Sequence, residues 1–127
     1  RGTKPEHIVR AALEAQAYQT MDLFTAMKND TGIDIKKVRV DGGLVNNSWV
    51  CQFISDIVRV SIDRPVITET TALGVAYMAG LKAGVFHDLE HIRTLWLSDK
   101  SFEPAMNDNK ANELYSGWTK SIERVQL

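Results

Sequence analysis

The chain has 127 residues, of which 44% are hydrophobic and 24% are charged, and this size predicts one globular domain with little room for a second. Fifteen lysines and arginines oppose sixteen aspartates and glutamates, so the formal net charge of −1 excludes the cationic surplus typical of proteins that bind nucleic acid or anionic lipid. The longest apolar run, Ala72 to Leu81, is far shorter than the roughly twenty residues that a membrane-spanning helix needs. We therefore expect neither nucleic acid nor a membrane as a partner.

Cys51 is the single cysteine, so it cannot form a disulfide within the chain. Its apolar neighbours predict a buried thiol on a helix, which is typical of proteins from a reducing compartment, and we expect a cytoplasmic location. The chain begins with Arg1 rather than methionine and shows no signal-peptide pattern, so we expect it to be truncated at its N-terminal side.

A long first helix is predicted from the start of the chain. Residues 3–6 have the spacing of a capping box, with a threonine hydroxyl and a glutamate three residues later, and Pro5 suits a first helical turn. Gly32 can supply a left-handed cap at the other end. Such a helix is about 40 Å long at 1.5 Å per residue and needs a large partner surface. Its apolar side chains recur at helical spacing: Leu13, Ala17, Met21, Phe24 and Met27.

A strand, a glycine turn and a second helix follow. Residues 36–41 alternate valine with charged residues, as in a short strand, and Gly42-Gly43 then breaks the pattern. Asn46-Asn47-Ser48 can cap a helix that continues with apolar residues at helical spacing to Val58.

The next predicted strand covers residues 60–66, where Pro65 restricts it to a sheet edge or a strand end. Glu69 suits the start of a third helix, whose ridge of small residues would allow close approach of a backbone. The pattern weakens after Gly84, until a final amphipathic stretch that includes Trp118. Helices that alternate with short strands predict the α/β class, with helices packed on a short sheet. The small ridge consists of Ala72, Ala76, Ala79 and Ala83.

The first candidate site is the glycine turn between the predicted strand and the second helix. Glycine lets a ligand approach the backbone amides of Gly42 and Gly43, and the following helix N-terminus attracts phosphate. The Asn47 side chain can donate and accept hydrogen bonds, which suits an adenine edge or a ribose. The motif matches neither a P-loop nor a dinucleotide fingerprint, and a plain turn is the alternative interpretation.

The second candidate is a metal site in the segment His87-Asp88-Leu89-Glu90-His91. It has the H-x-x-E-H spacing of inverted zinc peptidases, with two imidazoles one helical turn apart and a glutamate as possible general base. A catalytic zinc needs a third ligand, and His7, the remaining histidine, lies in the first turn of the long helix. A solvated histidine pair is therefore the alternative to a zinc hydrolase. Tyr115 and Trp118 have spacings typical of a core or an interface, and we assign them no chemistry.

Four stretches of the chain show a family likeness, namely residues 7–27, 38–57, 64–65 and 69–80, and a weaker likeness continues at residues 102–104 and 115–118. In their order and separations they resemble the C-terminal part of the FGGY carbohydrate kinases. Within that family the motif Asp41-Gly42-Gly43, together with Gln19-Thr20 and Arg64-Pro65, is more similar to the glycerol-phosphorylating members than to xylulose or gluconate kinases. Another sugar kinase of the family remains the alternative.

The resemblance implies part of an actin-like, ribonuclease H-like ATPase domain, so residues 1–127 would form a C-terminal ATPase subdomain. ATP with Mg²⁺ would bind in a cleft shared with the N-terminal part of the same polypeptide, and glycerol would be the acceptor in a homo-oligomeric enzyme. Gly42, Gly43 and Asn47 would bind the nucleotide: the amide of Gly43 would meet the phosphates, and the Asn47 side chain would reach the base. The catalytic aspartate would lie upstream, so this chain alone would be inactive. Lys110 occupies the position where some bacterial members carry a regulatory glutamate, which puts that regulation in doubt.

Overall fold

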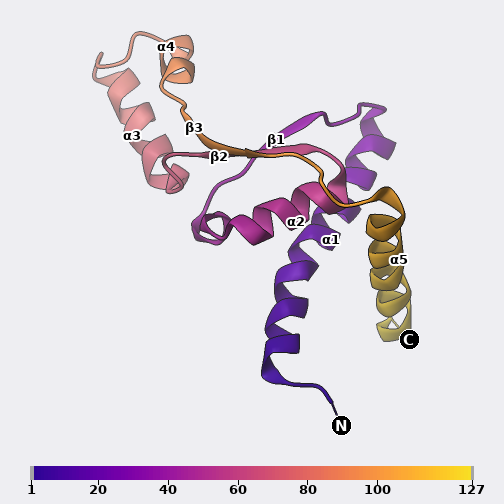
Figure 1. The fold of residues 1–127 in the computed structure, drawn as a ribbon. Helices are drawn as coiled ribbons and strands as arrows, with labels where there is room; N and C mark the ends of the chain where they lie inside the picture. The colour runs from indigo at the N-terminus through magenta and orange to yellow at the C-terminus, as the bar shows by residue number, and fades with distance from the viewer. Residues whose placement is uncertain (1, 127) are drawn as a thin grey trace.

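A computed structural model describes residues 2–126 (Figure 1). Helices alternate with short strands, which confirms the predicted α/β class. In chain order the elements are α1 (Pro5–Thr31), β1 (Lys37–Arg39), the 3₁₀ helix η1 (Gly43–Asn46), α2 (Ser48–Val58), β2 (Ser61–Pro65), α3 (Thr70–Lys82), α4 (Leu89–Thr94), β3 (Ser98–Phe102) and α5 (Asp108–Val125).

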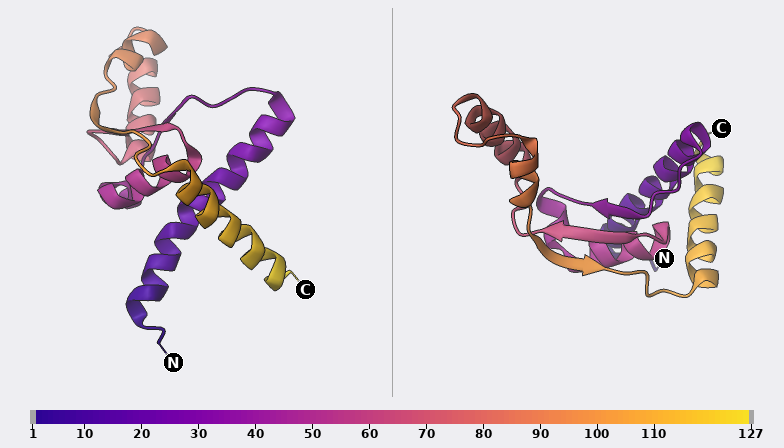
Figure 2. Two further views of the ribbon diagram at one scale, coloured as in Figure 1. Left: turned by 45° about the vertical axis from the view of Figure 1, so that its right-hand side comes forward. Right: turned by 90° about the horizontal axis from the view of Figure 1, so that it is seen from above.

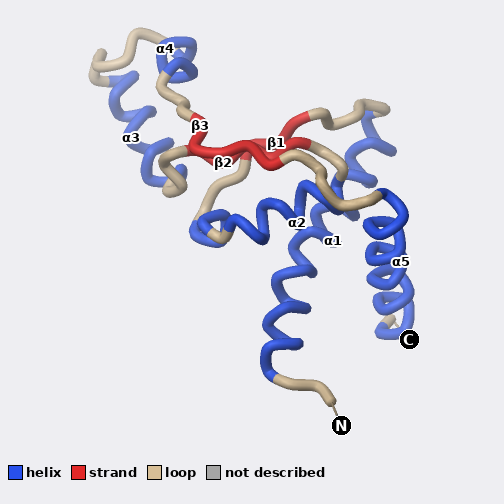
Figure 3. Tube along the Cα trace, in the orientation of Figure 1, coloured by secondary structure: helices blue, strands red, loops and turns tan. Residues whose placement is uncertain are grey.

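The three strands form one sheet in the order β1-β2-β3. β1 and β2 are parallel, with Val38 opposite Ile62, whereas β3 is antiparallel and places Phe102 opposite Ile62. Helices α1 and α2 lie on one face of this sheet (Figure 3). Figure 2 shows α3 and α4 extending from one end of the strands and α5 standing at the opposite end.

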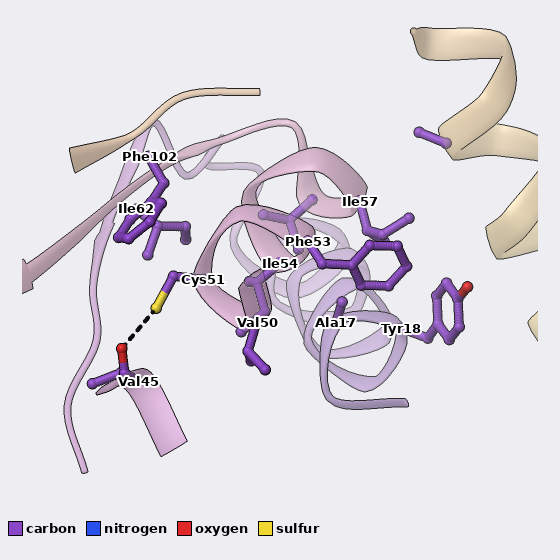
Figure 4. Packing of buried hydrophobic residues seen from close by; sticks show 12 residues of the cluster. Ala17, Tyr18, Val45, Val50, Cys51, Phe53, Ile54, Ile57, Ile62 and Phe102 are labelled. Atoms are coloured by element: carbon purple, nitrogen blue, oxygen red, sulfur yellow. Dashed lines mark hydrogen bonds between the residues drawn. The ribbon is translucent and has the colours of Figure 1, made fainter. Parts of the chain in front are cut away.

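The core lies between α2, the sheet and the middle of α1. Val50 and Cys51 of α2 and Ile62 of β2 are almost fully buried, and Ala17 of α1 packs against the same helix (Figure 4). From Val50 onward nearly every residue of α2 is buried, including the polar Ser55 and Asp56, which is typical of a helix enclosed by other elements. The buried thiol that the sequence predicts at Cys51 is confirmed.

Helix α5 is attached to α1 by both polar and aromatic contacts. The Asp22 carboxylate accepts hydrogen bonds from the Tyr115 hydroxyl at 2.5 Å and from the Trp118 indole N–H at 2.9 Å. The Trp118 ring stacks on Tyr18, with 5.5 Å between the ring centroids. The prediction that Tyr115 and Trp118 take part in packing is thereby confirmed.

The connection from β3 to α5 is tied to the C-terminal half of α2. The buried Asp56 carboxylate accepts from the backbone N–H groups of Ala105 at 2.7 Å and Met106 at 3.0 Å. Arg59 donates to the Met106 carbonyl at 2.8 Å and pairs with the Asp108 carboxylate. These contacts satisfy a buried charge and hold the entry to α5.

Most of the predicted helices and strands occur in the structure, and the differences concern where they begin and where they lie in the sheet. α1 begins at Pro5 and ends at Thr31, and the φ of 68° at the following Gly32 confirms the left-handed cap. The capping box on Thr3 was wrong, because the N-cap is Lys4, whose N–H donates to Nδ1 of His7 at 3.1 Å. β2 ends at Pro65 as expected, but it is the central strand rather than an edge.

Strand β3 lies in the segment where the sequence pattern weakens. Its sequence, Ser-Asp-Lys-Ser-Phe, lacks the apolar alternation that marks a half-buried strand. In the structure only the Phe102 side chain of this strand is buried. β3 therefore forms because it pairs with β2, and the strand preferences of its own residues do not predict it.

Helix α3 projects away from the sheet and has no buried residue in the described chain. Its contact with the following segment depends on Gly80, because a Cβ there would lie 2.5 Å from the Phe86 ring. The alanine ridge from Ala72 to Ala83 is exposed, so no backbone among residues 2–126 covers it. Within that same range no helix has both the length and the apolar character for crossing a membrane.

Candidate functional site

The glycine turn lies at the carboxyl end of the parallel strand pair. The Val40 N–H donates to the Asp63 carbonyl at 3.1 Å, which continues the pairing of β1 and β2 by one residue. The chain then leaves the sheet at Asp41 and enters η1. In open α/β sheets, ligands bind outside the carboxyl ends of parallel strands, so this edge is where a site is expected.

Gly42 and Gly43 have different structural requirements. Gly42 has a φ of 86°, a left-handed conformation that L-residues adopt at a cost, and its N–H donates to the Thr68 carbonyl at 2.8 Å. Gly43 has no such conformation, and no atom lies within 4 Å of the place where its Cβ would be. Gly42 therefore shapes the turn, whereas Gly43 leaves open space over the backbone at the start of η1.

Asn47 links η1 to α2. Its side-chain oxygen accepts from the Trp49 N–H at 3.0 Å, which is the N-cap that the sequence predicts for α2. Its own N–H donates to the Leu44 carbonyl at 3.1 Å and closes η1. Because the oxygen points to the helix end, the NH₂ group is the part of the amide available to donate to a ligand.

The structure thus brings the three predicted residues together around one turn of 3₁₀ helix. A hydrogen bond of 3.2 Å from the Val45 N–H to the Gly42 carbonyl joins the two ends of this turn. The Val45 carbonyl accepts in addition from the Cys51 thiol at 3.2 Å. Burial raises the pKa of that thiol despite the opposing charge of Arg64, so Cys51 keeps its proton as a donor.

The sequence did not indicate how the turn is held to its surroundings. The Arg64 guanidinium reaches from β2 to the Val45 carbonyl at 3.0 Å, and Asp99 of β3 pairs with it from the other side. The Thr70 hydroxyl donates to the Asp41 carboxylate and joins the start of α3 to the end of β1. Arg64 was noticed only as part of a family-like dipeptide, and nothing local marks Asp99 as its partner.

A cavity of about 370 Å³ opens at the same end of the sheet, between β2, α3 and α4. Its walls are mainly apolar, and the Arg39 guanidinium lies 3.9 Å from the centroid of the Trp96 ring at its margin. None of Gly42, Gly43 and Asn47 lines it, so it is separate from the glycine turn.

The histidine pair does not form the metal site that was considered as an alternative. The rings of His87 and His91 stack with 5.4 Å between centroids, and the His87 N–H donates to Nδ1 of His91 at 3.5 Å. Glu90, the possible general base, pairs with Arg93 at 3.0 Å. No group of three or more metal-ligating side chains occurs among residues 2–126, so a zinc hydrolase is not favoured.

Comparison with known proteins decides the family. The model of the C-terminal domain of the FGGY family of carbohydrate kinases matches residues 1–83. The chain belongs to this family. It is similar to a glycerol kinase from Oceanobacillus iheyensis, with 53% identity over 126 residues that cover 99% of the chain and 25% of that protein. A glycerol kinase from Xanthomonas axonopodis pv. citri is 51% identical over 123 residues, which cover 97% of the chain and 25% of that protein. This FGGY chain spans about a quarter of the length of these relatives.

Solved structures of FGGY kinases share the fold. The Plasmodium falciparum glycerol kinase with ADP has 35% sequence identity and a TM-score of 0.82, covering 99% of this chain and 25% of that one. The gluconate kinase from Lactobacillus acidophilus has 20% identity and a TM-score of 0.74, covering 98% of this chain and 26% of that one, which shows the fold alone. The predicted fold class of this FGGY chain is thereby confirmed.

Proposed function

We propose that this chain is the C-terminal ATPase subdomain of an ATP-dependent glycerol kinase, a cytoplasmic enzyme that transfers the γ-phosphoryl group of ATP to glycerol and forms sn-glycerol 3-phosphate. The observation that carries the proposal is the 51–53% identity to glycerol kinases over nearly the whole chain. The ADP in the crystal structure of the Plasmodium falciparum glycerol kinase supports nucleotide binding by the same fold.

In this proposal the glycine turn serves the nucleotide. The N–H of Gly43 stands at the first position of η1, where a helix offers no internal acceptor, and a phosphate oxygen can accept from it. The open space beside Gly43 lets the nucleotide approach the backbone. The NH₂ group of Asn47 donates to a ring nitrogen of the base, while its oxygen continues to cap α2.

The remaining chemistry belongs to residues outside this chain. Phosphoryl transfer depends on alignment of donor and acceptor and on stabilisation of the charge on the moving group, with Mg²⁺ supplying charge neutralisation on the phosphates. The described residues contain no cluster that would hold Mg²⁺ by themselves, so the nucleotide phosphates would carry the ion. The catalytic base and the glycerol pocket would lie in the N-terminal part of the polypeptide, and residues 1–127 alone would be inactive.

Exposed apolar side chains support contact with that N-terminal part and assembly into a homo-oligomer. Ile8 and Val9 on α1 are 65% and 59% exposed, and Val75 and Met78 on α3 are both 68% exposed. Clusters of this kind are typical of surfaces that another chain or domain covers.

The test is a kinetic comparison in the complete polypeptide, with ATP and either glycerol, xylulose or gluconate as substrates. Glycerol should be the preferred acceptor. Replacement of Gly43 by valine should raise the KM for ATP about tenfold and leave the KM for glycerol within about twofold, because the new side chain fills space that the fold leaves empty but the nucleotide needs.

Gly117→Val is the matched control, since Gly117 on α5 also has open space where a Cβ would lie and is outside the turn. It should leave both KM values unchanged. Preference for another sugar would overturn the substrate, and equal effects of Gly43→Val on ATP and glycerol would overturn the role of the turn.

A further inference from the structure

Arg64 of the central strand makes an unusually complete set of contacts with the glycine turn. Its Nη1 atom lies 3.0 Å from the Val45 carbonyl, 3.4 Å from the Asn46 carbonyl and 3.2 Å from the Ser48 hydroxyl. These three acceptors span the end of η1 and the first residue of α2. A single guanidinium nitrogen therefore contacts both elements that meet at this point.

The opposite side of the same guanidinium is fixed by β3. The Asp99 carboxylate oxygen Oδ2 lies 2.8 Å from Nε and 2.7 Å from Nη2 of Arg64. The Arg64 side chain is only 13% exposed, so these contacts are partly shielded from solvent. The planar guanidinium presents donors in fixed directions, and Asp99 thereby aims Nη1 at the turn in a way that a flexible ammonium group does not reproduce.

Helix α2 does not stabilise the positive charge of the Arg64 guanidinium. A cation near the N-terminus of a helix is unfavourable, because that end carries the positive part of the helix dipole. The carbonyl groups at the end of η1 lack internal donors, however, and they can accept from Arg64. The arrangement stabilises the 3₁₀ turn itself, and Asp99 offsets the charge of Arg64.

We propose that Arg64 is a positioning residue for nucleotide binding, which sets the separation between the Gly43 amide and the Asn47 side chain by holding η1. The inference rests on the proposed function, since those two groups are taken to bind ATP. Arg64 itself would act through the turn, and Asp99 would act through Arg64.

The test compares Arg64→Lys with wild type in the complete polypeptide by two measurements. Titration calorimetry with ADP should show about a five- to tenfold weaker Kd, which corresponds to the loss of one or two hydrogen bonds that hold the turn. Steady-state kinetics should show the KM for ATP raised by the same factor and the KM for glycerol within about twofold. Asp99→Asn, a change at a half-exposed position, should also raise the Kd for ADP and the KM for ATP, but by a smaller factor.

Arg59→Lys is the matched control. Like Arg64, Arg59 donates to a backbone carbonyl distant in the chain and pairs with an aspartate. It lies at the C-terminal end of α2, however, away from the glycine turn. It should leave the ADP Kd unchanged. Wild-type ADP affinity in Arg64→Lys and Asp99→Asn, or an equal loss in Arg59→Lys, would overturn the positioning role. Wild-type ADP binding without glycerol turnover would instead overturn the proposed substrate, and the two failures are thus distinguishable.

Discussion

At the scale of single residues, Asn47 combines a structural role with the ligand-binding role that we propose for it, both in one amide group. Its oxygen accepts from the Trp49 N–H and caps α2. The proposed contact with the nucleotide base uses its NH₂ group instead. The two roles can be separated by substitution because aspartate is as good an N-cap as asparagine but lacks the donor.

Asn47→Asp should leave the Tm of the protein nearly unchanged and raise the KM for ATP about tenfold, since it keeps the cap and removes one hydrogen bond to the base. Asn47→Ala should also lose about 1 kcal/mol of stability, because it removes the cap. Thermal unfolding and ATP kinetics on both variants check this. If the KM for ATP rises in Asn47→Ala but not in Asn47→Asp, Asn47 serves only as the cap of α2.

At the scale of elements, both α2 and α5 pack against the long helix α1. Its contact with α5 depends on Asp22, which accepts from two side chains of that helix. Burial together with the neighbouring Asp22 carboxylate raises the pKa of Tyr115 to about 12. The tyrosine is therefore protonated as a donor through the neutral range, and the contact weakens only at strongly alkaline pH.

Asp22→Ala should destabilise the fold by about 1 kcal/mol, because two hydrogen bonds to a charged group are lost at a partly solvated position. Urea unfolding followed by tryptophan fluorescence measures this, since Trp118 lies in the affected contact. Asp30→Ala, at an exposed position near the end of the same helix, should change the free energy of unfolding by less than half as much. Equal effects would show that α5 is held by the stacking on Tyr18 instead.

At the scale of the whole molecule, one buried carboxylate connects all three strands. Asp63 of β2 is 3% exposed, pairs with Lys37 of β1 at 2.6 Å and accepts from the Ser101 hydroxyl of β3 at 2.6 Å. Burial raises the pKa of Asp63, but the bonds from Lys37 and Ser101 and the nearby positive charges outweigh it, and the net shift is downward. The charged form therefore stabilises the folded state.

A group with a lowered pKa contributes stability above its unfolded pKa of about 3.9, and this contribution is lost as the pH falls through the folded value. The Tm of wild type should therefore decline below about pH 4, and Asp63→Asn should be less stable at pH 7 with a shallower acid decline. Calorimetry from pH 3 to pH 7 checks this. Asp34→Asn is the matched control, because Asp34 pairs with Lys28 at the same 2.6 Å but in full solvent. An identical acid slope in Asp63→Asn and wild type would contradict the assigned role.

Much of the architecture was determined by local sequence. The helices α1, α2 and α3 follow from apolar spacing and from caps such as Gly32 and Asn47, since these signals act within a few residues. The glycine turn was predicted from the Gly42-Gly43 pair that breaks the strand pattern, and the structure adds that Gly42 has a left-handed φ, which few other residues tolerate. The three candidate site residues lie within one short segment, so sequence alone could bring them together.

The tertiary structure decided what depends on contacts between distant segments. β3 became a strand by pairing with β2, although its own residues show no strand pattern. Arg64 and Asp99 are 35 positions apart in the chain, and only the pairing of β2 with β3 makes them neighbours of the turn. Local preference is a property of a few consecutive residues, whereas a hydrogen bond between remote side chains exists only once the sheet has formed, and for this reason the support of the site could not be predicted.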